Sequence, residues 1–525
     1  MSKREGLVLL CDADVNSKSV YRVESNCACA TDAPALLYDR AMVTTNVAET
    51  DCACAVEKRR DVVDSETCHG EALHFVPPLH VEGLTDGFWL GFNPLGQGGV
   101  AVFNRDVHDL LQAFSQPRSI AEGMRAAGDP PDGHRIAARL ASLSLLESID
   151  STPRARFAQP RTLTAWLHIT NDCNLRCPYC FVDKTPDKMQ IEQGQQAVDA
   201  VFRSALANGY RRVKLKYAGG EATLNFAVVC ALHEHAQTLA ERHDMDLEGV
   251  VLSNGVASSL RMIRELKRLG IRMMISLDGV GESHDRQRPF ADGRGSFKQV
   301  ERTLDRLAAE HVVPSISITI TRHNLAGLAD TVDYVLQRDL PFVLNFYREN
   351  DCSVSFGDLA YDDEEVIAAI QSAFAVIEAN LPPYSLTDRL LDLGRLDAPH
   401  ERTCGVGQSY LVIDQAGAVA KCHMDLAHPV TDIDAADPLR LIRADQIGIQ
   451  NPSVEEKEGC RDCTWRNWCA GGCPALTYRV TGRYDIKSPN CRIYKAIFPD
   501  VLRLEGLRLL KYGLGDGANR RVPIH

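Results

Sequence analysis

The chain has 525 residues, of which 45% are hydrophobic and 24% are charged, and its formal net charge is −12. This length predicts more than one domain. The acidic balance excludes the basic surface that nucleic-acid binding needs. The sequence has no apolar run long enough to span a membrane and no signal peptide at its start. We therefore expect a cytoplasmic protein that binds neither nucleic acid nor membrane.

Eighteen cysteines stand out in this composition. Cytosolic thiols are kept reduced, so a disulfide framework is not expected. Ten of the cysteines fall in short spacings that are typical of metal or cluster ligands. The cysteines therefore predict iron or zinc chemistry.

Residues 1–74 are polar and contain two near-copies of one motif, ESNCACATD at 24–32 and ETDCACAVE at 49–57. We consider two interpretations of this segment. It is either a disordered or metal-binding tail, or a substrate peptide fused to the protein that modifies it.

The sequence of residues 75–150 predicts a small domain. Two short strands flank a Gly-rich turn, and helices with apolar residues at i, i+3 and i+4 follow. Its size is that of a winged helix. An exposed strand edge in such a domain can bind a peptide as an added strand. The alternative is a dimerisation or packing appendage. A linker is expected at 151–160.

Residues 160–382 alternate apolar, β-branched strands with amphipathic segments. The expected strands are 162–170, 212–220, 249–255, 271–279, 314–321 and 341–348. A strand followed each time by a helix predicts a parallel α/β sheet or barrel. Folds of this kind place their chemistry in the loops after the strands.

The loop after the first of these strands, HITNDCNLRCPYCF at 168–181, carries Cys173, Cys177 and Cys180. A protein-held zinc site or four-iron cluster normally takes four thiolates. Three thiolates leave one iron of a [4Fe–4S] cluster open to an exogenous ligand. The alternative is a zinc site or scattered core cysteines.

The segment CNLRCPYC resembles the signature of the radical SAM superfamily, including the aromatic Tyr179, and the resemblance covers roughly 160–380. It implies a partial (β/α)6 barrel and a [4Fe–4S] cluster on the catalytic residues Cys173, Cys177 and Cys180. It also implies that S-adenosylmethionine (SAM) occupies the open iron and is cleaved to a 5′-deoxyadenosyl radical.

The same resemblance implies a SAM site at the strand ends, where YAGGEATLN at 217–225 looks like the family's GGE motif. The implied SAM-binding residues are Tyr179, Gly219, Gly220, Glu221, Ser253, Asn254, Ser276, Asp278 and Arg288. Asn-Gly and Asp-Gly are also ordinary turn residues, and Arg288 could be a structural surface residue instead.

Residues 400–496 predict a loop-rich block with seven cysteines, which exceed one zinc site and fall one short of two. Their order and spacing resemble the SPASM domain, which implies two auxiliary [4Fe–4S] clusters and three clusters in total. Cys460, Cys463, Cys469 and Cys491 would hold the distal cluster, and Cys404, Cys422 and Cys473 the proximal one. Some members have a further cysteine where this chain has Tyr410, so the fourth proximal ligand is open. Residues 497–525 are expected to form a C-terminal tail.

The domain at 75–150 resembles the PqqD-like element that captures leader peptides in the biosynthesis of ribosomally made peptides. Together the resemblances imply a radical SAM/SPASM peptide maturase that cross-links a precursor peptide, most plausibly through a Cys thioether, with flavodoxin or ferredoxin as reductant. C–C or C–O cross-linking, epimerisation and maturation of a sulfatase or quinone enzyme are alternatives. A non-enzymatic Fe–S protein that binds peptide or senses redox state is a further one.

Two residues, His423 and Cys352, bear on the alternative functions. Sulfatase maturases carry an Asp after the second SPASM cysteine, where this chain has His423. Cys352, which follows the sixth strand, is expected near the barrel mouth and is a weak candidate for the hydrogen donor that an epimerase would need.

Overall fold

The computed structural model describes residues 79–513, except 86, 97, 98, 131, 132, 150–156, 158, 354, 356 and 389. Before residue 79 it describes the backbone of four short strands, β1 (Leu9–Cys11), β2 (Tyr21–Val23), β3 (Ala35–Leu37) and β4 (Leu73–His74). The paired-cysteine motifs at 24–32 and 49–57 lie outside the described residues. In the described part, no helix is both long and apolar enough to cross a bilayer.

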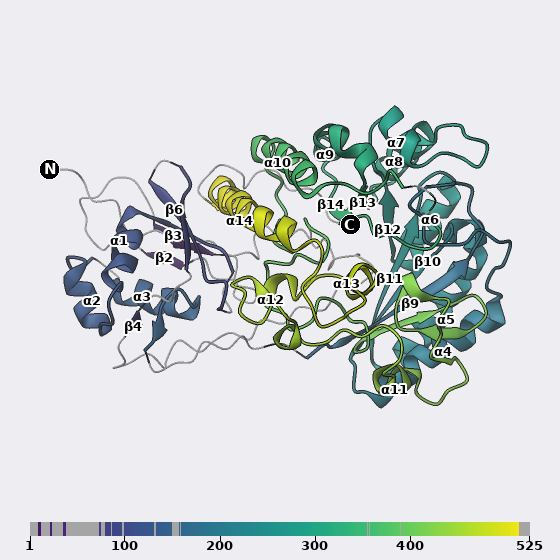
Figure 1. Ribbon diagram of the computed structural model, residues 1–525, viewed down its shortest axis with the longest axis horizontal. Coiled ribbons are helices and arrows are strands. Elements are labelled where there is room, and N and C mark those ends of the chain that lie inside the picture. Colours follow the sequence, from purple (N-terminus) through teal and green to yellow (C-terminus); the bar gives the residue numbers. More distant parts are fainter. Residues whose placement is uncertain are drawn as a thin grey trace.

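The core of the molecule is a sheet that begins with six parallel strands (Figure 1). These are β9 (Thr162–Thr170), β10 (Arg212–Gly219), β11 (Asp246–Ser253), β12 (Ile271–Ser276), β13 (Ser315–Ile320) and β14 (Phe342–Phe346). They lie side by side in chain order, so the predicted strands and their parallel arrangement are confirmed. The nine residues of β9 are all buried, as expected for a strand covered on both faces.

Helices follow the strands and cover the outside of this sheet. They are α4 (Ile191–Ala207), α5 (Phe226–His243), α6 (Leu260–Leu269), α7 (Glu282–Gln287), α8 (Phe297–Ala309), α9 (Leu328–Leu336) and α10 (Asp363–Ala379). Local sequence sets their ends. The Ser259 side chain caps the first turn of α6, and Gly270 ends that helix in the left-handed conformation, as such residues commonly do.

The C-terminal block extends the same sheet beyond β9. β15 (Tyr410–Ile413) pairs parallel to β9, and the antiparallel strands β16 (Ala418–Ala420) and β17 (Thr431–Asp432) follow. All four residues of β15 are buried. Although the block is rich in loops, apolar burial therefore organises its first part. Beyond β17 lie the short helices α11 (Pro438–Ala444), α12 (Arg466–Cys469) and α13 (Pro474–Thr481).

The last described helix, α14 (Cys491–Gly513), corrects the predicted boundary at residue 497. Residues 497–513 are not a tail but the greater part of this helix. Ile497, Phe498, Val501 and Leu502 are buried in the main core. Apolar burial therefore continues the helix beyond the point where the cysteine spacing ends.

The N-terminal domain contains an antiparallel sheet and three helices. The elements are β5 (His80–Gly83), β6 (Phe88–Phe92), β7 (Ala101–Asn104), α1 (Arg105–Ala113), α2 (Ile120–Ala126), α3 (Gly133–Ser142) and β8 (Glu147–Ser148). β1 completes the sheet in the order β1-β7-β6-β5, and β4 pairs with β8. These two pairings cross the predicted boundary between 1–74 and 75–150.

The two faces of the N-terminal sheet pack on different parts of the molecule because side chains alternate along a strand. Ala101 and Phe103 of β7 join a cluster with α1 and α3. Val102 joins the main core, in which α14 takes part. Figure 1 shows α14 lying between the N-terminal sheet and the rest of the molecule.

Polar and aromatic contacts hold the N-terminal domain against the C-terminal block. The indole N–H of Trp468 donates to the carbonyl oxygen of Pro94 over 2.6 Å. The Phe92 ring lies 4.8 Å from the Trp468 ring, and Arg503 of α14 pairs with Glu82 at 3.2 Å. The N-terminal domain therefore sits directly on the segment that contains Cys469.

Candidate functional site

The three-cysteine loop leaves the carboxyl end of β9 and folds back on itself. The backbone N–H of Cys180 donates to the carbonyl of Cys177 at 3.1 Å, and the N–H of Leu175 lies 3.4 Å from the sulfur of Cys173. Lys184 directs its ammonium to the sulfur of Cys180 at 2.9 Å. Cys177 also lies close enough to Cys173 and Cys180 for their charges to interact, and the Lys184 cation stabilises thiolate charge at Cys180.

Burial sets the chemistry of these thiols. It raises the pKa of Cys177 to about 12, and it also raises the pKa of Cys173. Metal ions bind the thiolate, so ligation of a metal by these cysteines would release protons. In the described part of the chain, no three Cys, His, Asp or Glu side chains are grouped tightly enough for one metal ion.

The glycine pair of YAGGEATLN lies directly against the cysteine loop. A Cβ on Gly219, whose φ is +134°, would lie 2.3 Å from the carbonyl oxygen of Thr170, and one on Gly220 would lie 2.3 Å from that of Asp172. The N–H of Gly220 donates to the carbonyl of Thr170 at 2.7 Å. Side chains are thus excluded because the backbone of the cysteine loop crosses here.

Glu221 is the centre of a buried hydrogen-bond network between the strand ends. Its carboxylate accepts from the Ser253 hydroxyl at 2.9 Å and from the Asn254 backbone N–H at 2.6 Å. The Asn254 amide in turn donates to Asn174 at 2.7 Å and lies 3.7 Å from the Cys173 sulfur. The predicted residues Glu221, Ser253 and Asn254 therefore meet, and they meet at the cysteine loop.

A second network joins Tyr179, Asp278 and Arg288. The Tyr179 hydroxyl donates to Asp278 and accepts from Arg288, and the Arg288 guanidinium lies 3.1 Å from the same Asp278 oxygen. Burial holds the pKa of Tyr179 well above its usual range, so the phenol stays protonated. The Nε of Arg288 is buried and has no hydrogen-bond partner. One donor of this network is thus left to bind something outside the protein.

The remaining predicted residue, Ser276, ends β12 opposite Ser317 of β13. Sequence reasoning missed three side chains around the loop. Asn174 and Lys184 are those described above, and Asn350 donates to the carbonyl of Tyr179 at 3.2 Å. Only Lys184, four residues after Cys180, carries a recognisable signal as a cation near the cysteines. Cys352 is exposed, with its sulfur 3.6 Å from the carbonyl of Phe181.

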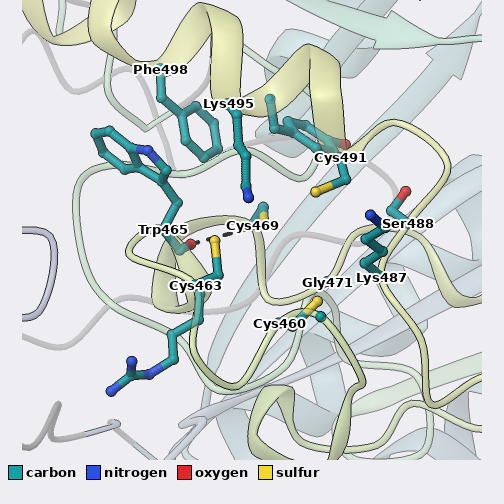
Figure 2. A pocket seen from close by; sticks show the side chains of 13 residues that line it. Cys460, Cys463, Trp465, Cys469, Gly471, Lys487, Ser488, Cys491, Lys495 and Phe498 are labelled. Carbon is teal, nitrogen blue, oxygen red and sulfur yellow. Dashed lines mark hydrogen bonds between the residues drawn. The ribbon is translucent and has the colours of Figure 1, made fainter.

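One pocket in the C-terminal block collects four of the predicted cluster cysteines. Its lining includes Cys460, Cys463, Cys469 and Cys491. Figure 2 shows these cysteines around a common space, with the amine of Lys495 reaching toward it from α14. Burial raises the pKa of Cys460 to about 11 and that of Cys469 to about 12. The structure therefore brings the predicted distal set together.

The other three cysteines of this block form a separate group under β15. Cys404 and Cys422 are buried in a cluster with Trp166 of β9, and Cys473 packs against it. Burial raises the pKa of Cys404 to about 12 and raises that of Cys422 as well. Trp166 of β9 contacts this group, and the three-cysteine loop follows the end of the same strand. β9 therefore adjoins both cysteine-rich regions of the chain.

Lys457 lies between the two groups. Only 1% of its surface is exposed, and its ammonium donates to the carbonyl of Ala470 at 2.8 Å. Burial lowers the pKa of Lys457, while cysteines of both groups, including Cys404 and Cys460, act in the opposite direction. Gly471 has a φ of +84°, and a Cβ there would lie 2.5 Å from the Lys457 chain. The glycine makes room for a buried cation.

A family model matches the part of the chain that contains the first site. Residues 167–335, from within β9 to the end of α9, match the model of the Radical SAM superfamily. These residues form a radical SAM domain. Proteins of this superfamily bind a [4Fe–4S] cluster and SAM, and the domain contains the three-cysteine loop and both networks. The predicted radical SAM domain is confirmed for these residues, and so is its mixed α/β fold.

Two curated relatives extend beyond this domain. The antilisterial bacteriocin subtilosin biosynthesis protein AlbA of Bacillus subtilis is 26% identical over 275 residues, which are 50% of this chain and 55% of AlbA. The PqqA peptide cyclase of Methylobacterium nodulans is 24% identical over 352 residues, 64% of this chain and 87% of the cyclase. The chain thus spans about half the length of AlbA.

A solved structure has the same fold. Native anSMEcpe with bound AdoMet and Cp18Cys peptide superposes with a TM-score of 0.54 at 18% identity, over 67% of this chain and 100% of that one. At this identity the likeness concerns the fold alone. The assignments of the individual cluster and SAM ligands remain predictions.

Proposed function

We propose that the protein is a radical SAM/SPASM maturase that installs a cross-link, a Cys thioether, in a ribosomally made peptide. The observation that carries this proposal is the meeting of both polar networks at the three-cysteine loop, within a radical SAM domain. AlbA and the PqqA peptide cyclase, which match much of the chain, support a peptide substrate by their names.

The residues of the first site fit a cluster and SAM. Cys173, Cys177 and Cys180 supply three thiolates and leave one coordination position open. The free Nε of Arg288 and the carboxylate of Glu221 offer a cationic donor and an anionic acceptor on the same side of the sheet. A zwitterionic amino-acid moiety, such as that of SAM, needs this pair of charges.

When bound, the cluster and SAM would supply a 5′-deoxyadenosyl radical that takes hydrogen from carbon. This chain's residues hold and orient those groups. Asp278 is fixed by the Thr319 backbone N–H at 2.7 Å and by Arg288. Tyr179 is half-buried and links Asp278 to the cysteine loop through its hydroxyl.

The cross-link balances as follows. SAM takes up one electron and yields methionine, and the substrate carbon gives one hydrogen atom to 5′-deoxyadenosine. When the carbon bonds to a Cys sulfur, the thiol gives up a proton and one electron. The electron would pass to an oxidised iron–sulfur cluster that the C-terminal cysteines would hold. Each thioether therefore lowers the substrate mass by two hydrogens and uses one SAM.

In this proposal the C-terminal block holds two auxiliary clusters. The pocket lined by Cys460, Cys463, Cys469 and Cys491 supplies four thiolates, a complete set for one cluster. The buried group of Cys404, Cys422 and Cys473 supplies three. The N-terminal sheet would bind the leader peptide, and flavodoxin or ferredoxin would supply the electron.

The experiment that tests this function is anaerobic reconstitution followed by incubation with SAM and dithionite. Formation of 5′-deoxyadenosine is expected. Cys177→Ala should abolish it by removing a ligand of the first cluster, whereas Cys463→Ala should lose only auxiliary iron and destabilise its loop. A fully iron-loaded protein that forms no 5′-deoxyadenosine would favour the Fe–S binding or sensing alternative.

A further inference from the structure

The pocket that collects the four distal cysteines lies close to the protein surface. Three of these cysteines, Cys463, Cys469 and Cys491, are only half-buried. In the other group of the C-terminal block, Cys404 and Cys422 are buried. A cluster held in the distal pocket would therefore be the more accessible of the two to another protein, and electron transfer between proteins becomes steeply slower with distance.

Positive charge surrounds this pocket. Its lining includes Arg466, Lys487 and Lys495, and none of the described residues that line it is Asp or Glu. Arg461, between the first two cysteines of the set, is exposed as well. Residues 455–495 contain eight Lys or Arg and five Asp or Glu, which gives this segment a net charge of +3 in a chain of net charge −12. The basic character is therefore local to this part of the chain.

The charges of Arg461, Lys487 and Lys495 are available to a partner. All three side chains belong to exposed residues, and among the described residues none of them forms an ion pair with a carboxylate. Burial raises the pKa of Cys491, and both Lys495 and Lys487 oppose this shift, so their ammonium groups lie close to the cysteine. Figure 2 shows them on either side of Cys491. Carboxylates of a docking protein could meet these cations without breaking an internal ion pair.

The cavity beside the loop after β14 has a different character. It has a volume of about 710 Å³, and its lining includes the four carboxylates of Glu349, Asp351, Asp425 and Asp445. Its Arg479 is held by Glu349 at 3.1 Å and by Asp351 at 2.8 Å. An acidic protein would meet carboxylates at this cavity, whereas it would meet cations alone in the lining of the distal pocket.

From these observations we infer that the surface formed by Arg461, Lys487 and Lys495 is the docking site of an acidic one-electron carrier of the flavodoxin or ferredoxin class. The carrier exchanges electrons with the distal cluster. With flavodoxin, the anionic flavin hydroquinone gives one electron to the oxidised cluster and becomes the neutral semiquinone, so no proton moves. The inference rests on the proposed function, in which the distal cysteines hold a cluster. It adds the place at which the reductant binds.

Electrostatics favours this orientation of the carrier. A chain of net charge −12 repels an acidic carrier over most of its surface, so a local basic patch steers the encounter to one place. Electron-transfer complexes are among those that bury the least surface. A patch of three cations around one pocket is therefore large enough for such an encounter.

The first test measures contact and needs no turnover. The iron-loaded protein is mixed with flavodoxin and treated with a carbodiimide, which joins lysine amines to carboxylates that touch them. We expect cross-links at Lys487 and Lys495, and far fewer at the exposed Lys298 of α8. Cross-links spread evenly over the exposed lysines, or concentrated away from the distal pocket, would overturn the inference.

The second test reverses the charges. Arg461→Glu/Lys487→Glu changes the patch, and Lys298→Glu/Arg302→Glu, which changes two exposed residues of α8, is the control with the same net charge. In calorimetric titration with flavodoxin at low salt, Kd should rise about tenfold or more in the patch variant only. The difference should shrink at about 0.5 M salt, because salt screens exposed charges. Equal Kd values in the two variants would overturn the inference.

Two reductants separate this inference from the proposed function. Stopped-flow absorbance should show cluster reduction by flavodoxin hydroquinone to be about tenfold slower in the patch variant than in the control. Photoreduction with 5-deazariboflavin, which is small and uncharged, should be equally fast in both. Equal slowing with both reductants would overturn the docking role. Failure of the fully reduced parent protein to form 5′-deoxyadenosine from SAM would instead overturn the proposed function.

Discussion

The hydroxyl of Tyr410 lies 3.2 Å from Nδ1 of His423, and both side chains are buried beside Cys422. Burial lowers the pKa of His423 to about 3, so the ring is neutral. The Trp166 ring stacks on the imidazole at 4.6 Å. Tyr410, which stands where some relatives have a further cysteine, is thus engaged by a histidine.

This pairing predicts that Tyr410 is not an iron ligand. Tyr410→Phe should cost about 1 kcal/mol of stability through one lost hydrogen bond, with unchanged iron content and unchanged electron paramagnetic resonance of the reduced auxiliary clusters. Tyr478→Phe, in which the exposed Tyr478 still stacks on Tyr484, is the matched control. A changed cluster spectrum in Tyr410→Phe alone would mean that the phenol binds iron.

Tyr179→Phe should weaken SAM binding. The phenol connects Asp278 and Arg288, and a hydrogen bond to a charged group contributes about 1.5–3 kcal/mol. We expect KM for SAM to rise about tenfold or more, with 5′-deoxyadenosine formation as the assay. Tyr334→Phe, which removes a hydroxyl bonded to Glu301 on the outer helices, should leave KM unchanged. Equal KM values in parent and Tyr179→Phe would refute the role.

Trp468→Phe should loosen the N-terminal domain. The variant keeps a ring against Phe92 but leaves the Pro94 carbonyl without its donor, which costs about 1–3 kcal/mol for a buried acceptor. Hydrogen exchange in residues 88–104 should accelerate. Trp465→Phe keeps the Pro94 bond and serves as the comparison, so similar acceleration in both variants would contradict the prediction.

Lys457→Met should shift the auxiliary clusters to more negative reduction potentials. A buried cation favours the extra negative charge of a reduced cluster, and cluster potentials follow local charge. Redox titration followed by electron paramagnetic resonance measures the shift. Lys495→Met removes a cation from the distal pocket only. It should therefore shift the reduction potential of one auxiliary cluster, whereas Lys457→Met should shift the potentials of both. If neither signal moves in Lys457→Met, its charge does not reach the clusters.

Acid should destabilise the protein through buried histidines. Burial lowers the pKa of His233 to about 4, whereas in the unfolded chain it is about 6.5. Below pH 6.5 the unfolded state therefore binds a proton that the folded state does not, and stability falls as the pH falls toward 4. At pH 5 this single histidine costs about 2 kcal/mol.

The measurement is the thermal midpoint of the parent and of His233→Gln at pH 7.5 and 5. The variant loses the hydrogen bond with Tyr217, so it should be less stable at pH 7.5. Between pH 7.5 and pH 5, its thermal midpoint should also fall less than that of the parent. An identical drop in both proteins would show that His233 does not contribute to acid sensitivity.

Sequence reasoning succeeded where the determinants are local. Apolar runs bounded by turn residues located β9 to β14, and the spacing of Cys173, Cys177 and Cys180 located the first site. It failed where partners are distant in the chain. Nothing near Tyr410 indicates that it pairs with Thr164 of β9, because that register depends on the finished sheet.

The glycine pair shows a different limit. The motif was correctly placed at a strand end, but the neighbour that excludes side chains at Gly219 and Gly220 is the loop backbone at Thr170 and Asp172. The end of the C-terminal block was misjudged for a related reason. The cysteine spacing ends at Cys491, whereas the fold continues through α14 because its buried residues meet the main core and the N-terminal sheet.

α14 also gives the molecule an order of assembly. Its first residue, Cys491, belongs to the distal cysteine pocket, and twelve residues later Arg503 pairs with Glu82 on the N-terminal sheet. With Cys491 bound to iron as proposed, iron binding in that pocket would fix the first residue of α14. The N-terminal sheet packs against this helix. In a protein made without iron, the N-terminal sheet, which we propose to bind the leader peptide, would lack this support. Through α14, peptide binding would therefore depend on prior assembly of the distal cluster.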